Sequence, residues 1–530
     1  MNLLRPSHTH TAFTATLLLM GFSLLSSLMG LVRTKYIAWL FGSGMEADAL
    51  TAAFNLPDQI SYFLTGAMLS TTLVTILTRY REDGRVEAGF RSLSIILSTM
   101  FLVLGTAVVA GEYAAPLYVH IFLHGFNADP AKAALCVRLT RILLPAQLCF
   151  FAGGVCSAVA IAQKKFTVQG FAPLIYNLGT IVGGVLLVHR LGVSALALGT
   201  LAGAFCGNFL LNALFAYRLG LRYRFILDWK DEGLREWVRM TLPLMAGISL
   251  VAADPWIISY FASTTDGAIA LMNYAKRLFA APLGMLAAAA GVASQPFFAS
   301  LWAKGQRFEF ATEVADSVSR IVSLGLLAAS GMVALALPLV DLIWMGGRFN
   351  RADAQSCAVF FAIYTLSLCL WSAQSMYSRA FYAAGNTLLP MIAATAVTVV
   401  SIPIYAVLYR WYGAMGLAIA SDLGIALQTV CLAVLLHSRR MVSIASLDFK
   451  EMGRCLLAGV TSGAAVWAVF IEGPGRLLPL LRAHLSVQAR WTDIVALIAG
   501  TVLWLLIAKW VLEKSGSALP RVTMKRLGMG

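Results

Sequence analysis

The chain has 530 residues, of which 59% are hydrophobic and only 12% are charged. A soluble globular protein has about 45–50% apolar and about 25% charged residues, so this composition excludes a soluble domain and indicates a polytopic membrane protein. The formal net charge of +15 does not indicate a nucleic-acid partner, because the lysines and arginines are dispersed between apolar runs.

Apolar runs long enough to cross the hydrocarbon core of a bilayer, about 18 residues or more, recur from one end of the chain to the other. We therefore predict an all-α polytopic membrane protein with about 14 transmembrane helices. The first run is too long for a signal peptide and has no small-residue cleavage motif before Arg33, so we expect it to be retained. The predicted spans cover 12–32, 49–77, 93–110, 142–162, 171–188, 192–216, 241–262, 278–299, 321–345, 356–378, 388–409, 413–436, 455–471 and 492–512.

Lysines and arginines are concentrated after the even-numbered spans. The odd-numbered spans are followed by fewer cations, such as Arg190 and Arg410. Since positively charged loops stay on the cytoplasmic side, this bias predicts that both termini of the chain are cytoplasmic. The cations that follow even-numbered spans include Arg79, Arg81, Arg85, Lys165, Arg218, Lys304, Arg307, Arg439 and Arg440.

Three weak internal matches, in the same order and at one offset of roughly 220 residues, predict that two six-helix halves are related by duplication. The longest polar stretch, 218–239, lies near the middle of the first twelve spans and is typical of an amphipathic helix on the cytoplasmic surface. The matching features are GVSALALG at 192–199 with GAMGLAIA at 413–420, Pro173 with Pro390, and Pro57 with Pro282.

These features predict four parts of the chain. We expect residues 1–217 to form an N-terminal lobe with spans 1–6, and residues 218–240 to form a cytoplasmic amphipathic linker. Residues 241–440 are expected to form a C-terminal lobe with spans 7–12, related to the first lobe by a pseudo-twofold repeat. Residues 441–530 then contain spans 13 and 14 as a C-terminal helix pair, followed by a basic cytoplasmic tail.

Charged side chains inside the predicted spans are few. An ionised side chain at the middle of a bilayer costs about 2.5–3.5 kcal/mol, so such residues usually face a protein interior or a water-filled cavity and mark a functional path. The charged residues in the spans or at their rims are Arg33, Lys35, Asp48, Asp58, Arg138, Arg141, Asp254, Lys276, Arg277 and Asp422.

Arg33 and Arg277 are the strongest candidates for binding an anionic substrate. Each lies on a helix marked by Gly or Pro, in MGLVRTK and YAKRLFAAPLG, that can bend towards a central cavity. Two guanidinium groups that face one cavity would bind a phosphate or pyrophosphate group through paired hydrogen bonds. Lys35, Asp48 and Lys276 are candidate neighbours, and the alternative is that these side chains extend to the membrane surface.

Asp254 precedes Pro255 in VAADPWII, where the proline ring disrupts a helical hydrogen bond and frees a backbone carbonyl. A carboxylate beside a freed carbonyl can hold a cation, which makes Asp254 a candidate ion-coupling residue. The alternative is that Asp254 only neutralises a neighbouring arginine, because buried charges are usually paired.

Motifs of enzymes are missing from the sequence. There is no P-loop, nucleophile elbow or H-E-x-x-H motif, so the sequence supports neither ATP hydrolysis nor a hydrolytic reaction. The eight cysteines form no C-x-x-C pair, and we expect neither a metal site nor a disulfide framework. These observations favour a transporter over an enzyme.

Four segments of the sequence resemble the MurJ/MviN family, which comprises flippases of lipid-linked cell-wall precursors in the multidrug/oligosaccharidyl-lipid/polysaccharide exporter superfamily. They are GLVRTKYIAWLFGSGMEADALTAAFNLPD, NYAKRLFAAPLGML, MGGRFNRADA and FYAAGNTLLP. The resemblance implies two six-helix lobes around a cationic cavity and a terminal helix pair that forms a groove for a polyprenyl tail. It places the family's substrate-binding arginines on Arg33 and Arg277, and its span-2 aspartate on Asp48.

Some members of this family bind a sodium ion between spans 7 and 11, and the resemblance places that site on Asp254 and Asn386. We expect no other cofactor. The empty carrier would be reset by the membrane potential or by coupling to Na⁺ or H⁺.

The chain departs from the family pattern at two places. Ser27 stands where the family has a second span-1 arginine, and Ser61, Tyr62 and Thr65 stand where it has an arginine pair followed by a glutamate. A cavity without these groups would hold pyrophosphate less strongly, unless Lys35 and Lys276 compensate, or the chain moves a different lipid-linked glycan.

We therefore expect a flippase that moves an undecaprenyl-pyrophosphate-linked saccharide, lipid II, from the cytoplasmic to the periplasmic leaflet of the bacterial inner membrane. Transport would proceed by alternating access and serve cell-wall synthesis. The expected partners are the lipid-linked saccharide, the lipid bilayer and proteins of cell-wall synthesis, and no nucleic acid.

Three alternatives remain open at this stage. A related exporter would move lipid-linked exopolysaccharide or O-antigen repeat units. A cation-coupled drug antiporter of the same superfamily should favour an acidic, apolar cavity over one with arginines. If the protein were a membrane scaffold that transports nothing, the presence of Arg33 and Arg277 in apolar spans would have no explanation.

Overall fold

The computed structural model describes residues 12–65, 67–163, 165, 167–245, 250–472, 489–517 and 519. Within these ranges all regular structure is helical, apart from one isolated bridge between Gly346 and Phe349. The predicted all-α fold is therefore confirmed. The basic tail beyond residue 519 lies outside the described residues.

The chain divides into two compact units. Unit 1 comprises Met1–Ile37, Ser43–Ile248 and Ile258–Ile269, and unit 2 comprises Ala38–Gly42, Ser249–Ile257 and Ala270–Gly530. The helices of unit 1 are most of α1 (Ala12–Phe41), α2 (Met45–Thr65), α3 (Ala67–Glu82), α4 (Val86–Phe122), η1 (His124–Ala128), α5 (Pro130–Leu143), α6 (Ala146–Ala162), α7 (Thr167–Leu191), α8 (Ser194–Gly203), η2 (Ala204–Leu210), α9 (Leu211–Arg218) and α10 (Glu232–Met245).

Helix α11 (Leu250–Ala262) begins in unit 2 and ends in unit 1, and α12 (Ala268–Ala303) then belongs to unit 2 for nearly all of its length. The remaining helices of unit 2 are α13 (Arg307–Ala334), α14 (Ala336–Trp344), α15 (Arg351–Leu366), α16 (Leu368–Ala383), α17 (Leu388–Ser438), η3 (Ile444–Ser446), α18 (Phe449–Trp467), η4 (Ala468–Glu472) and α20 (Ala489–Lys514).

All fourteen predicted spans overlap helices, but several spans are interrupted. Breaks lie at Pro145 between α5 and α6, at Ser367 between α15 and α16, and at Gly413, whose φ of 57° divides α17. In the described ranges, eight helices are each long and apolar enough to cross a membrane, or nine if the pair α15–α16, bent by 42°, forms one span. Broken helices are tolerated in membranes where neighbouring helices satisfy the freed backbone groups.

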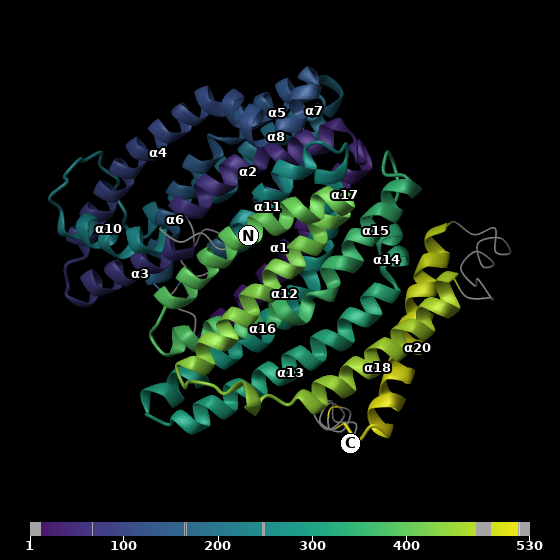
Figure 1. Cartoon of the computed structure of the whole chain (residues 1–530). Helices are drawn as coiled ribbons and strands as arrows, with labels where there is room; N and C mark the ends of the chain where they lie inside the picture. Colours follow the sequence, from purple (N-terminus) through teal and green to yellow (C-terminus); the bar gives the residue numbers. More distant parts are fainter. Residues whose placement is uncertain are drawn as a thin grey trace. The chain divides into compact units, whose positions relative to one another are not determined.

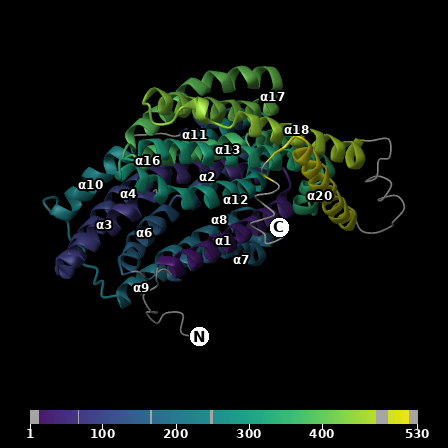
Figure 2. The same ribbon diagram turned by 90° about the horizontal axis from the view of Figure 1, so that it is seen from below.

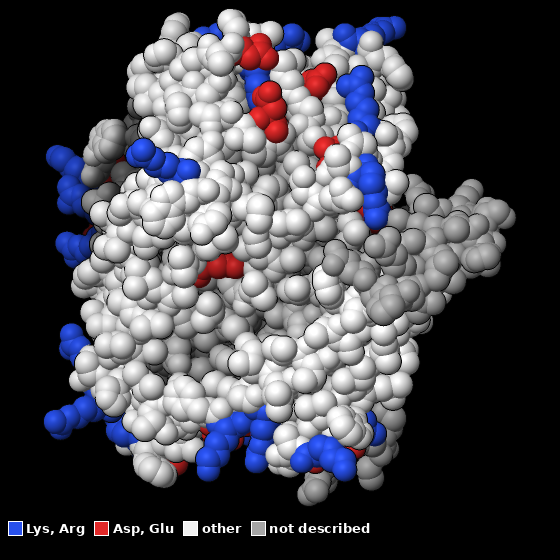
Figure 3. Space-filling model, turned by 45° about the vertical axis from the view of Figure 1, so that its right-hand side comes forward, with Lys and Arg blue, Asp and Glu red and all other residues white. Residues whose placement is uncertain are grey.

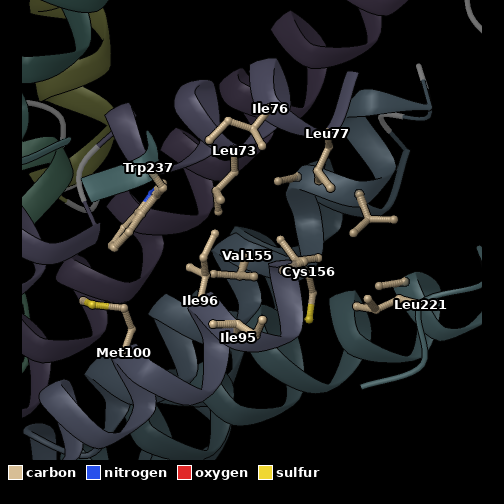
Figure 4. Packing of buried hydrophobic residues seen from close by; sticks show 14 of the residues in the cluster. Leu73, Ile76, Leu77, Ile95, Ile96, Met100, Val155, Cys156, Leu221 and Trp237 are labelled. Carbon is tan, nitrogen blue, oxygen red and sulfur yellow. The ribbon is translucent and has the colours of Figure 1, made fainter. Parts of the chain in front are cut away.

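The core of unit 1 forms where α3, α4, α6 and α10 meet (Figure 4). Leu73 and Ile76 of α3 pack against Ile95 of α4 and Val155 of α6, and each of these side chains is at most 2% exposed. At the polar end of this bundle the Arg79 guanidinium donates two hydrogen bonds to the Glu236 carboxylate, one of them at 2.8 Å. This pairing lowers the pKa of Glu236 below its ordinary value.

The prediction of an amphipathic helix over 218–239 is wrong for residues 219–231. Helix α10 begins only at Glu232, where Asp231 accepts hydrogen bonds at the helix start, including one from the Leu234 N–H at 2.9 Å. The preceding residues are not helical and begin at Gly220, whose φ of 102° favours glycine. The Ser98 hydroxyl of α4 binds this segment instead, accepting a hydrogen bond from the Ile226 N–H at 3.3 Å.

The predicted C-terminal helix pair is confirmed in unit 2, where α18 and α20 pack on each other and on α13 (Figure 1). Trp504 of α20 donates a hydrogen bond from its indole nitrogen to Ser330 of α13 at 3.0 Å. Gly459 and Gly463 of α18 lie against Ser330, which brings the backbones close together. The pseudo-twofold repeat and the four-part division of the chain stay predictions.

The outer surface is poor in charge. Most of the face drawn in Figure 3 is white, with an acidic group near its middle, and lysine and arginine side chains lie mainly along its lower, left and upper margins. Large apolar side chains are exposed on many helices, such as Leu186 of α7 at 70% and Ile498 of α20 at 62%. An exposed apolar surface of this extent is expected of a protein whose solvent is lipid.

Helices α7 and α8 of unit 1 pack through glycines (Figure 2). A Cβ atom on Gly183 would lie 2.5 Å from the Gly199 Cα, and one on Gly179 would lie 2.5 Å from the Gly203 Cα. These contacts leave no room for a methyl group, so the interface depends on small residues at four positions, as close helix packing in membranes often does.

We predict that Gly183→Ala lowers the thermal stability of the protein in detergent, because overpacking of a close interface typically costs about 1–3 kcal/mol. Gly105→Ala is the matched control, since a Cβ atom there meets nothing within 4 Å. Alanine is also the better helix former, so the control should unfold at the wild-type temperature or above it. Equal unfolding temperatures for the two variants would contradict this account of the α7–α8 interface.

Candidate functional site

Arg33 lies on α1 of unit 1 and is only 9% exposed. Its Nε and Nη1 atoms are buried and have no hydrogen-bond partner among the described residues. The guanidinium carbon lies 5.4 Å from the ring centre of Tyr176 on α7, which offers a cation–π contact. Such a contact stabilises a desolvated cation by about 2 kcal/mol or more but satisfies no N–H donor, so part of the hydrogen-bonding capacity of Arg33 is left for a ligand.

The other predicted cations differ from Arg33 in burial. Lys35 is half-buried on α1, and Arg277 is exposed on α12 of unit 2. Arg33 and Arg277 therefore belong to different units, and their convergence on one ligand stays a prediction.

Asp48 of α2 is fully buried and does not extend to the membrane surface. Its Oδ2 atom accepts hydrogen bonds from the Lys132 Nζ at 3.0 Å and from the Gly267 N–H at 2.7 Å. Lys132 of α5 is itself 2% exposed, lies over the ring of Phe126, and also donates to Asp266 at 2.9 Å. Within unit 1 this ionic cluster anchors the connection between α11 and α12, so the geometry favours a structural role for Asp48.

Asp254 of α11 is 6% exposed and forms an ion pair with Lys276 of α12 in unit 2. Its other carboxylate oxygen accepts a hydrogen bond from the Tyr405 hydroxyl of α17. The Lys276 Nζ also lies 5.0 Å from the ring centre of Tyr364. The neighbour that neutralises Asp254 is thus a lysine, where the alternative from the sequence named an arginine.

A second carboxylate, Asp422 of α17, belongs to the same group, because it lies within electrostatic range of Lys276 and Asp254. Its Oδ1 atom is buried without a hydrogen-bond partner among the described residues. The group therefore has two carboxylates and one ammonium group, and we call Asp254, Lys276, Tyr364, Tyr405 and Asp422 the α11–α17 cluster.

The predicted sodium site at Asp254 and Asn386 stays a prediction. One oxygen of Asp254 is paired with Lys276, and the other accepts a hydrogen bond from the Tyr405 hydroxyl. Asn386 is exposed before α17, where its Oδ1 accepts a hydrogen bond from the Leu389 N–H at 3.1 Å and caps the helix. We propose that Lys276 is the cation that these carboxylates hold.

We predict that the thermal stability of the wild-type protein is the same in sodium and in choline buffers. Lys276→Gln removes the internal cation and leaves two buried carboxylates without compensation, a change that typically costs about 3–5 kcal/mol. Sodium should therefore raise the unfolding temperature of Lys276→Gln relative to choline.

Lys509→Gln is the control, since Lys509 forms only an exposed pair with Glu513 at 3.8 Å and should lose little stability. A wild-type protein that is stabilised by sodium as strongly as Lys276→Gln would contradict the assignment of Lys276.

Several residues of these clusters could not be identified from the sequence. Lys132 lies before the predicted span 142–162 and in no motif, and only the fold brings it to Asp48. Tyr405 and Tyr364 lie in apolar runs with no motif. The side chains of Ser61 and Thr65, at which the chain departs from the family pattern, lie outside the described residues.

A family model described as lipid II flippase MurJ matches residues 37–473 of the chain. A probable lipid II flippase MurJ of Vibrio cholerae is 25% identical over 462 residues, which cover 84% of this chain and 87% of that protein. A protein of the same description from Bdellovibrio bacteriovorus is 26% identical over 477 residues, with 88% and 90% coverage.

Solved structures show the same fold. A lipid II flippase MurJ in an inward closed conformation has a TM-score of 0.75 at 18% identity and covers 94% of this chain and 99% of that chain. An inward-facing multidrug resistance transporter of the MATE family has a TM-score of 0.64 at 16% identity, with 78% and 94% coverage. At these identities the structural likeness establishes the fold alone.

Proposed function

We propose that this chain, which belongs to the MurJ family of lipid II flippases, translocates lipid II from the cytoplasmic to the periplasmic leaflet of the bacterial inner membrane. The family model covers most of the chain, and the chain is accordingly a multi-pass membrane transporter and not an enzyme. Its substrate is then a polyprenyl-pyrophosphate-linked saccharide that serves cell-wall synthesis.

The observation that carries this proposal is that Arg33 is buried with hydrogen-bond donors that have no partner among the described residues. A buried guanidinium whose Nε and Nη1 nitrogens lack partners among the described residues lowers stability, because burying a donor without a hydrogen bond costs about 1–3 kcal/mol. A pyrophosphate offers the oxygens that these groups need, in a geometry that suits a planar fork. In a site of low dielectric constant the attraction is stronger than on an exposed surface.

Other residues of the chain are candidates for binding the polyprenyl tail and for completing the pyrophosphate site. The outer faces of α18 and α20 expose apolar side chains such as Leu457 at 55% and Leu506 at 61%, which support a groove for the polyprenyl tail. We assign Arg277 to the pyrophosphate as a second ligand and Lys35 as an auxiliary, on the family resemblance. Alternating access and a contribution of the membrane potential complete the proposed mechanism.

An exporter of lipid-linked exopolysaccharide or O-antigen units remains the second candidate, because such substrates share the pyrophosphate and the polyprenyl tail. A drug antiporter is supported only by the shared fold of the MATE transporters. The partly unsatisfied Arg33 is a poor match for cationic drugs, since it would repel them.

We predict that the wild-type gene restores growth of a strain depleted of its lipid II flippase. Arg33→Ala should fail, because the loss of hydrogen bonds to a charged group worth about 1.5–3 kcal/mol weakens headgroup binding roughly ten- to a hundredfold. Arg33→Lys keeps the charge but loses the fork, so it should support intermediate growth. The measurement is growth after depletion, with the membrane level of each variant determined by immunoblot.

The unfolding temperatures of these variants distinguish a residue that binds the substrate from one that stabilises the fold. Because its Nε and Nη1 nitrogens have no partner among the described residues, Arg33→Ala should unfold at the wild-type temperature or slightly above it. Arg224→Ala, which changes an exposed cation outside the helices, should retain full growth. Well-inserted wild-type protein that gives no growth would favour the polysaccharide exporter, and normal growth of Arg33→Ala would remove Arg33 from the site.

Both termini are proposed to be cytoplasmic, on the distribution of cations around the spans. Reporter fusions at six loop positions test this orientation, and reversed signals at any two positions would contradict it. We expect cytoplasmic signals at Arg85, Lys230 and Arg440, and periplasmic signals at Gly44, Asn127 and Asn350.

A further inference from the structure

A surface cavity of about 600 Å³ lies between α4 and α5 of unit 1 and has no part in the proposed transport site. Two arginines and one glutamate line it together with apolar side chains. A volume of this size accommodates a small-molecule headgroup. The lining residues are Glu112, Ala134, Val137, Arg138, Arg141 and Ile142.

The spans predicted from the sequence place the cavity at the boundary of the hydrocarbon core. The predicted span of α4 ends at residue 110, two residues before Glu112, and the predicted span that continues into α6 begins at residue 142, directly after Arg141. Runs of this length cover about 27–31 Å, the thickness of the core. Tyr113 beside the cavity is 82% exposed, as expected of an aromatic residue at the level of lipid headgroups.

The charges in the cavity are not neutralised by the protein. The Arg141 Nε donates a hydrogen bond to the Glu112 backbone oxygen at 3.0 Å, which orients the guanidinium and leaves its terminal N–H groups available. Within the described part of the chain, neither Arg138 nor Arg141 forms an ion pair, and neither does the Glu112 carboxylate. Arg138 and Arg141 are three residues apart and so lie on one face of α5.

We propose that this cavity binds the headgroup of a phospholipid that carries a primary amine, phosphatidylethanolamine, in the leaflet on the side of the α4–α5 connection. The two guanidinium groups of Arg138 and Arg141 bind the phosphate diester through charge-assisted hydrogen bonds. The Glu112 carboxylate accepts hydrogen bonds from the ammonium group. Ala134, Val137 and Ile142 contact the glycerol and the first methylenes of the acyl chains.

The charge pattern selects this headgroup over the other common phospholipids. Phosphatidylglycerol supplies the phosphate but leaves Glu112 without a cation. Phosphatidylcholine supplies a cation, but its quaternary ammonium group has no N–H to donate. Among these three headgroups, only that of phosphatidylethanolamine satisfies both signs of charge and the hydrogen-bonding capacity of the carboxylate.

Native mass spectrometry of the full-length protein in detergent tests the proposal, with three lipids of identical acyl chains added in turn. We expect wild-type protein to bind phosphatidylethanolamine at least tenfold more tightly than phosphatidylglycerol or phosphatidylcholine. Arg138→Gln with Arg141→Gln should abolish this preference and weaken both phosphatidylethanolamine and phosphatidylglycerol. Glu112→Gln should weaken phosphatidylethanolamine only.

Arg222→Gln with Arg224→Gln is the matched control, because it removes two exposed arginines from the polar segment before α10. Arg138→Lys with Arg141→Lys keeps the charge, retains the fold and should bind with intermediate affinity. Wild-type protein that binds phosphatidylglycerol as tightly as phosphatidylethanolamine would overturn the proposal. The proposal would also be overturned if the two arginines were needed for binding of inorganic phosphate but not for binding of any of the three lipids.

Discussion

An ionised side chain at membrane depth needs a counter-charge or hydrogen-bond partners, because transfer of an isolated charge out of water costs more free energy than packing can offset. Both units contain an ion pair with a buried carboxylate, and that of unit 1 lies just outside the predicted spans. In unit 1, Lys132 holds Asp48 and Asp266 together, which ties the connection between α11 and α12 to α2 and α5. In unit 2, Lys276 does the same for Asp254 beside α17.

Arg33 differs from the two lysines of these ion pairs, which are paired with carboxylates. The paired lysines contribute to the fold, and their removal would leave a buried carboxylate without compensation. Arg33 has an aromatic ring beside it, but its Nε and Nη1 donate no hydrogen bond within the described residues, so the cation–π contact is the compensation that the structure shows for the cost of its burial. Such a cost is expected where a site is preorganised for a ligand that supplies the missing acceptors.

The spans could be predicted from the sequence because the bilayer imposes a length and an apolar composition that are visible in single runs of residues. The ionic partners could not, because they join residues such as Asp48 and Lys132 that are 84 positions apart. Asn386 was assigned to the sodium site by resemblance, which stays a prediction, and in the structure its Oδ1 accepts a local hydrogen bond from the Leu389 N–H. The segment before α10 was overpredicted as helix, because its mixture of aromatic and charged residues is amphipathic in the extended conformation as well.

On the proposed role of Arg33 as a headgroup ligand, the departures at Ser27 and Tyr62 have a physical explanation in what a carrier has to do. It binds its substrate in one orientation and must release it in the other, so affinity beyond what capture needs slows release. Each guanidinium contact with a phosphate contributes about 1.5–3 kcal/mol, so one contact fewer shortens the residence time of the headgroup roughly ten- to a hundredfold at an unchanged association rate. A desolvated arginine contributes more per contact than an exposed one. A site that contains the buried Arg33 therefore needs fewer cations than a site of exposed arginines to reach the same affinity for the headgroup.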